Sequence, residues 1–140
     1  GKKCRYMRLF AFICNLNNIS DIAKKQENMK NTQSLKRNND FRRIYSRGKS
    51  FAGGYVVVYV LKNRYRFNRL GITVSKSTGN AVMRNRAKRV IRAAYTNLED
   101  KLPQGGFDLV IVSRSRGAQK KEQQIRKDME YALRKLDLLT

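Results

Sequence analysis

A helical repeat of apolar positions runs through residues 80–98 and is the clearest pattern in the chain. At about 100° per residue, six apolar side chains fall on one arc: Met83, Ala87, Val90, Ile91, Ala94 and Leu98. The opposite side is polar, with Arg84, Lys88 and Arg92 in one row, Asn85 and Arg89 beside it, and Arg86 at the boundary. The pattern predicts a helix from about Asn80 to Leu98 that packs by one face and exposes four or five cations on the other.

The preceding segment predicts one helix and two strands. Asn38 or Asn39 can cap a helix over Asp40–Arg47, which Gly48 closes. The β-branched and aromatic run at 55–61 is typical of a strand. Alternation of apolar residues over 69–75 predicts a second strand. A polar link, 62–68, joins the two, and we expect them to form an antiparallel hairpin.

The remaining sequence predicts one more strand and one more helix. Residues 107–112 are nearly all apolar, which is typical of a strand covered on both faces. Apolar residues at helical spacing predict a last helix over Ala118–Leu139: Ile125, Met129, Ala132, Leu133 and Leu136. The predicted order is α-β-β-α-β-α, an α+β sandwich.

The charge of the chain points to a polyanionic partner. Lys and Arg number 32 against 10 Asp and Glu, for a formal net charge of +22 and a pI near 10.7. A basic surface of this kind is the electrostatic signature of nucleic-acid binding. Because 41% of the residues are hydrophobic, the chain is not simply a disordered basic tail.

The first 28 residues differ from the rest. Their apolar run, Leu9–Cys14, is six residues long, shorter than the roughly 7–15 residues of a secretion signal. Met29 opens a segment that resembles an ordinary protein start. We expect residues 1–28 to be an N-terminal extension outside the fold, and residues 29–140 to form a single α+β domain in the cytoplasm that binds a nucleic acid.

The residue inventory argues against a catalytic site on the protein. The sequence has no His, so acid–base and triad chemistry that uses His is excluded. Cys4 and Cys14 have no further Cys or His with which to form a zinc site. Asp128 and Glu130 lie on different faces of the predicted helix and suit a two-metal site poorly. We predict no catalytic residue and no metal site.

One long block resembles a known family. Arg84-Asn85-Arg86, within the stretch Gly79–Arg92, is similar to the signature of bacterial ribonuclease P protein components. Leu35-Lys36-Arg37 leading into Asp40–Tyr45, and the strand ending in Thr73–Lys76, agree with the same family. The resemblance implies a ribosomal-S5-like fold with a left-handed β-α-β crossover around the basic helix.

The resemblance also implies a function. The family assists removal of the 5′ leader from precursor tRNA, and its catalysis resides in an RNA subunit that positions Mg²⁺. The expected partners are that RNA and precursor tRNA, with no membrane and no obligate protein partner. A structural ribosomal protein that binds ribosomal RNA is the alternative. A DNA-binding domain that uses residues 80–98 as its recognition helix is a weaker alternative, because no second helix with helix-turn-helix spacing precedes them.

Two groups of residues are candidate RNA contacts. Those expected to bind the RNA subunit are Lys76, Asn80, Arg84, Asn85, Arg86, Lys88, Arg89 and Arg92. Those expected to stack on leader bases in an open groove are Phe41, Tyr45 and Tyr59. Simpler roles remain open: Asn80 as a helix cap, Asn85 as a solvated side chain, and the three rings as ordinary core.

Overall fold

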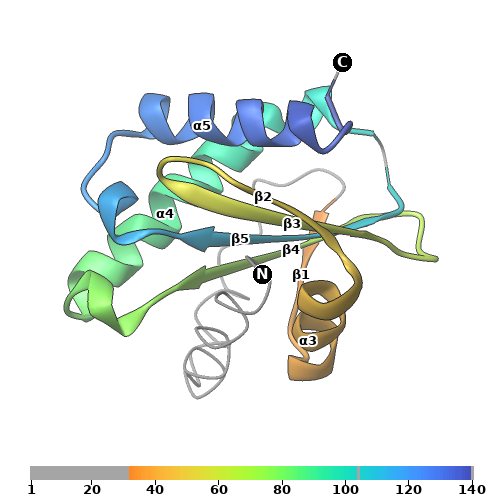
Figure 1. The fold of residues 1–140 in the computed structure, drawn as a ribbon, viewed down its shortest axis with the longest axis horizontal. Coiled ribbons are helices and arrows are strands. Elements are labelled where there is room, and N and C mark those ends of the chain that lie inside the picture. The colour runs from red at the N-terminus through yellow and green to blue at the C-terminus, as the bar shows by residue number, and fades with distance from the viewer. Residues whose placement is uncertain (1–31, 104, 140) are drawn as a thin grey trace.

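The computed structural model describes residues 32–103 and 105–139. They fold into a five-stranded sheet with helices on both faces (Figure 1). The predicted extension, 1–28, lies outside these residues. The strands have the order β1-β4-β5-β3-β2. Their bounds are Thr32–Ser34 for β1, Lys49–Ala52 for β2, Val56–Lys62 for β3, Asn68–Val74 for β4 and Phe107–Ser113 for β5. The helices are α3, Asn38–Arg47; α4, Ala81–Leu98; and α5, Glu122–Lys135.

β5 occupies the centre of the sheet. It pairs in parallel with β4, where Ile72 is opposite Ile111, and antiparallel with β3, where Val58 is opposite Ile111. The predicted antiparallel hairpin between β3 and β4 is therefore wrong, because β5 lies between them. The reason is the apolar run of β5, which is buried along Asp108–Ser113 and needs neighbours on both edges as well as cover on both faces.

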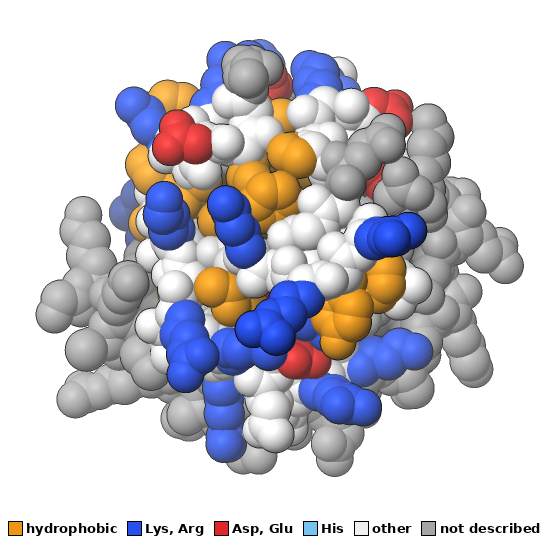
Figure 2. Space-filling view, turned by 90° about the vertical axis from the view of Figure 1, so that its right-hand side faces the viewer, with side chains coloured by type: hydrophobic (Ala, Val, Ile, Leu, Met, Phe, Trp, Pro, Cys, Tyr) orange, Lys and Arg blue, Asp and Glu red, His pale blue; other side chains and the backbone are white. Residues whose placement is uncertain are grey.

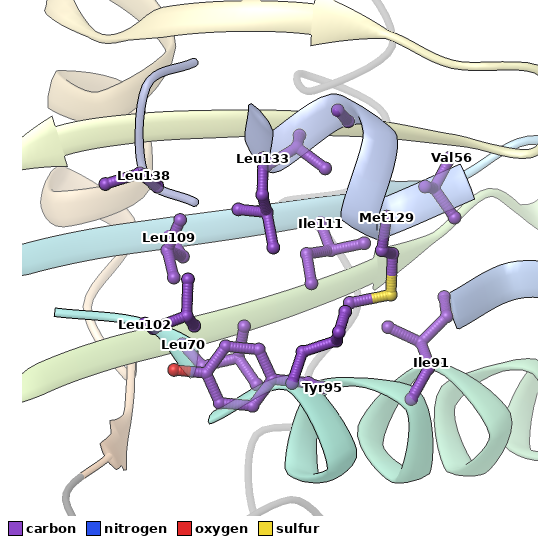
Figure 3. Close-up of a cluster of buried hydrophobic side chains, with 14 of the residues drawn as sticks. Val56, Leu70, Ile91, Tyr95, Leu102, Leu109, Ile111, Met129, Leu133 and Leu138 are labelled. Atoms are coloured by element: carbon purple, nitrogen blue, oxygen red, sulfur yellow. The ribbon is translucent and has the colours of Figure 1, made fainter. Parts of the chain in front are cut away.

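Helices α4 and α5 cover one face of the sheet. Figure 3 shows Ile91 and Tyr95 of α4 pointing toward the same core as Met129 and Leu133 of α5, over Ile111 of β5. Tyr95 is fully buried, and burial raises the pKa of its hydroxyl to about 12. The predicted helix at 80–98 and the buried central strand are both confirmed. β4 and β5 are joined through α4, as a parallel pair requires, and the left-handed sense of this connection stays a prediction.

Helix α3 lies on the opposite face, where it buries Ile44 and Tyr45 against β3 and β5. It begins at Asn38, and the residue in the cap position is Arg37, which makes no side-chain cap bond. The prediction that Asn38 or Asn39 caps the helix is therefore wrong. Asp40 in the first turn provides the negative charge that a helix start favours.

Three other elements differ from the predictions: two short strands and the last helix. The short strands β1 and β2 were not predicted, because β1 is polar, β2 is only half apolar, and both lie at the sheet edges, where no apolar alternation is required. β1 is held by the hydroxyl of Thr32, which lies 2.9 Å from the Tyr95 hydroxyl and donates to Glu99 at 2.9 Å. The last helix is shorter than predicted: a 3-10 turn at Ser115–Gly117 precedes it, and positive φ at Asp137 (61°) follows it.

One carboxylate fixes the turn between β2 and β3. Asp128 of α5 accepts hydrogen bonds from the backbone N–H groups of Gly54 (3.1 Å), Tyr55 (2.9 Å) and Val56 (3.0 Å). A Cβ atom at Gly53 would lie 2.5 Å from the same carboxylate, so only glycine allows this approach. Asp128 therefore attaches the turn to α5.

We expect Asp128→Ala to lower the free energy of unfolding by about 2–3 kcal/mol, because three amide donors lose a charged acceptor. Chemical denaturation measures this change. Glu130→Ala is the matched control: it also removes one acid from α5, but one whose partners Lys101 and Arg134 are exposed. Such surface pairs contribute about 0–1 kcal/mol. Equal losses in the two variants would contradict the role assigned to Asp128.

Candidate nucleic-acid interface

The start of α4 is a well-formed cap. Asn80 accepts a hydrogen bond from the backbone N–H of Met83 at 3.0 Å, so its role as a cap is confirmed. Gly79 precedes it with φ at 143°, where a Cβ atom would lie 2.7 Å from the Met83 sulfur. Lys76 is exposed in the 3-10 turn Lys76–Thr78 that leads into the helix. This end of α4 combines a cation with free backbone N–H groups, which favours an anion.

The outward face of α4 differs from the predicted one. Arg86, which the sequence placed at the boundary, is exposed, as are Asn85 and Arg89. The predicted basic row lies on a flank and is half-buried: Arg84, Lys88 and Arg92. Tyr95 explains the difference, because it joins Ala87, Ile91, Ala94 and Leu98 in the buried stripe and turns that stripe toward the row.

The flank and the outward face offer different electrostatics. Partial burial lowers the pKa of the Arg92 guanidinium, which nevertheless stays charged at neutral pH. The Nε atom of Arg84 is buried without a hydrogen-bond partner in the structure. Arg86 and Arg89 form no ion pair with a described acid, so their charge is uncompensated. We define the outward face of α4 as Asn85, Arg86 and Arg89.

The two predicted tyrosine platforms are buried. Tyr45 and Tyr59 are each 2% exposed, and their rings meet edge to face with centroids 4.6 Å apart. The sequence-based interpretation placed both rings on the wall of an open groove, and the structure places them in the core between α3 and the sheet. Tyr55 precedes β3 in the turn that Asp128 holds, and it packs against the core on the other face of the sheet.

Phe41 keeps partial exposure at the edge of that core. Its ring lies over Gly71 of β4, where a Cβ atom would approach the ring to 2.5 Å. Gly71 therefore lets the ring approach the strand closely, and Phe41 is the member of the aromatic group that a ligand can reach.

The sequence analysis missed a second basic feature. A hollow of about 860 Å³ lies between α3 and the loop 62–68, lined by seven Lys or Arg side chains and one acid, Asp40. Figure 2 shows Lys and Arg side chains gathered around an acidic one on this end of the molecule. We call it the basic hollow. The sequence analysis treated the loop 62–68 only as a polar link, because the loop has no helical or strand periodicity. It does, however, alternate cations with aromatic residues.

An ion-pair network links the lining of the basic hollow to the buried carboxylate of Asp108. Arg69 donates to both oxygens of Asp108, at 2.8 and 2.6 Å, and to Asp40 at 3.2 Å. The hydrogen bond to Asp108 raises the pKa of the Arg69 guanidinium, although burial opposes the shift. Arg43 lies 3.4 Å from Asp40 and 3.5 Å from Asp108. Asn63 donates to Asp108 at 2.7 Å, which anchors the loop.

A sequence model of the family described as ribonuclease P matches residues 29–137. The chain belongs to the ribonuclease P protein family. The "Ribonuclease P protein component" of Clostridioides difficile is 39% identical over 108 residues, which cover 76% of this chain and 94% of that protein. That of Lachnoclostridium phytofermentans is 49% identical over 84 residues, 60% of this chain and 72% of that protein.

Solved ribonuclease P proteins share the fold. The Staphylococcus aureus protein superposes with a TM-score of 0.69 at 34% identity, covering 76% of this chain and 97% of that one. The Thermotoga maritima protein gives 0.64 at 30% identity, covering 71% and 93%. Membership in the ribonuclease P family favours association with ribonuclease P RNA over the ribosomal alternative. No helix in the described part of the chain is long and apolar enough to cross a membrane.

We expect Arg86→Ala combined with Arg89→Ala to weaken binding to the ribonuclease P RNA without lowering the thermal midpoint, because both side chains are exposed. The slope of log K against log salt should fall by about one unit per lost phosphate contact. A matched control is Lys127→Ala with Lys135→Ala, which removes two exposed cations from α5. Equal slopes for the two double variants would contradict an RNA contact on the outward face of α4.

Proposed function

We propose that this protein assists removal of the 5′ leader from precursor tRNA by holding both the ribonuclease P RNA and the leader. The uncompensated cations on the outward face of α4 carry the proposal. Arg presents a planar fork that suits bidentate contact with phosphate, and like charges on one helix face repel unless a polyanion neutralises them. Lys76 and Asn80 at the helix start, and Arg84, Lys88 and Arg92 on its flank, extend this surface.

The chemical step belongs, in this proposal, to the RNA subunit. The whole sequence lacks His, and the described residues contain no group of three or more acids or Cys that could hold a metal ion. We assign Mg²⁺ mainly to the RNA subunit and the substrate, and to this chain the binding and orientation of RNA.

Leader recognition centres on Phe41 in this proposal. A half-buried ring at the edge of the sheet offers a surface on which an unpaired base can stack, and stacking tolerates variation in sequence. Tyr45 and Tyr59 would act beneath it, because their edge-to-face contact supports the layer on which Phe41 rests.

The overall function is tested by adding the full chain to its RNA subunit at low Mg²⁺ and measuring cleavage of precursor tRNA. Absence of stimulation would overturn it.

We expect Phe41→Ala to weaken binding of precursor tRNA to the assembled enzyme by about 1–3 kcal/mol, the scale of one stacking contact. Binding of mature tRNA, which has no leader, should stay nearly unchanged. Equilibrium binding of both RNAs, together with the thermal midpoint of the protein, measures the effect.

Phe51→Ala is the matched control for Phe41→Ala. Phe51 is also half-buried, but it packs on the other face of the sheet, with its ring centroid 5.6 Å from that of Tyr131. It should lower stability without separating the two tRNAs. An equal loss of affinity for precursor and mature tRNA in the Phe41 variant would refute its role in leader binding. Tyr59→Ala is a poorer probe, since truncating a buried aromatic costs about 3–5 kcal/mol of stability.

A further inference from the structure

The basic hollow and the start of α4 lie at opposite ends of β4. Arg69 and the loop that precedes it stand at the beginning of the strand, whereas Lys76 and Asn80 follow its end. Seven residues of strand span about 20 Å. An RNA segment bound at the start of α4 therefore does not fill the hollow unless it extends along the strand.

Most of the positive charge in the basic hollow is uncompensated. Asp40 and Asp108 are already occupied by Arg69 and Arg43. The five remaining cations form no ion pair with a described acid: Lys36, Arg37, Arg47, Lys62 and Arg64. Charges of one sign lining a concave surface concentrate anions there. A volume of about 860 Å³ accommodates more than one phosphate group.

An exposed aromatic side chain stands at the edge of these cations. Tyr65 is 51% exposed, stacks on Phe67 with centroids 5.1 Å apart, and lies 4.9 Å from the Arg69 guanidinium. Its backbone N–H donates to Asn63 at 3.0 Å, and Asn63 is itself bonded to the buried Asp108. The ring is therefore held in place before any ligand arrives. Phosphate-binding cations beside an aromatic side chain are the combination that binds single-stranded nucleic acid.

The basic hollow continues the surface that carries Phe41. Asp40, which lines the hollow, directly precedes Phe41, and Leu61 both lines the hollow and packs, as Phe41 does, against the core cluster beneath α3. Phe41 lies over Gly71, between the two ends of β4. The start of α4, Phe41 and the hollow thus follow one another along a single strand.

We propose that the basic hollow binds the leader nucleotides farthest from the cleavage point, with Tyr65 contacting an unpaired base and Arg64 an adjacent phosphate. The polarity follows from the order along β4: the RNA subunit contacts the α4 end, and the leader runs past Phe41 away from it. This inference rests on the proposed leader binding and adds a second leader contact to it.

The test uses the enzyme assembled from the full chain and its RNA subunit, with precursor tRNAs whose leaders lengthen one nucleotide at a time. For the wild-type protein, affinity rises once when the leader reaches Phe41 and again when it reaches the basic hollow. Arg64→Ala combined with Tyr65→Ala abolishes the second rise and weakens binding of the longest leader by about 5- to 100-fold. Binding of the shortest leader and of mature tRNA is unchanged.

Lys127→Ala with Tyr131→Ala is the matched control. It also removes one cation and one exposed ring, since Tyr131 is 54% exposed and has Lys135 5.4 Å from its centroid. Both rises persist in this control. Unchanged binding of long leaders by the Arg64 and Tyr65 variant overturns the inference. A loss of equal size at every leader length also overturns it, in favour of contact with the RNA subunit. Failure of the proposed Phe41 contact is distinguishable, because the wild-type protein would then lack the first rise in affinity and keep the second.

Discussion

The bidentate ion pair between Arg69 and Asp108 is the interaction on which the functional end of the molecule depends. Asp108 is fully buried at the beginning of the central strand, and a buried carboxylate is costly unless it is paired and hydrogen-bonded. Arg69 compensates it and joins β4 to β5, Asp40 extends the network to α3, and Asn63 extends it to the loop 62–68. One buried charge thereby sets the relative positions of Phe41, Tyr65 and the basic hollow.

The few acids of this chain serve its fold, and this determines where its positive charge appears. Two of the ten, Asp21 and Glu27, lie outside the described residues. At least six of the remaining eight accept hydrogen bonds or form ion pairs within the structure: Asp40, Glu99, Asp108, Glu122, Asp128 and Glu130. None of their ionic partners belongs to the outward face of α4. The cations there remain available to an external polyanion because the acids are engaged elsewhere.

Sequence periodicity predicted where helices and strands form better than it predicted which of them lie side by side. The α4 repeat and the apolar run of β5 are local signals, and both were interpreted correctly. The order of the strands was not, because consecutive strands usually pair and nothing local shows that β5 inserts between β3 and β4. The predicted buried face of α4 was rotated by part of a turn from the observed one, because it left out Tyr95. A tyrosine can be buried or exposed, and sequence spacing does not show that the Tyr95 hydroxyl contacts Thr32. The burial of Tyr45 and Tyr59 likewise depends on which strand faces α3, which spacing alone does not determine.

The contact between Asp128 and the turn before β3 has a consequence for the order in which the chain becomes stable during synthesis. The three amide groups that Asp128 binds precede it by 72 to 74 residues. While the ribosome is still translating, β2 and β3 can pair with each other, but their turn lacks its acceptor until α5 has emerged. β5, the central neighbour of β3, is also made late. The turn before β3 is therefore completed only by the C-terminal helix, and a chain truncated before residue 128 would contain all five strands but leave these three amides without their acceptor.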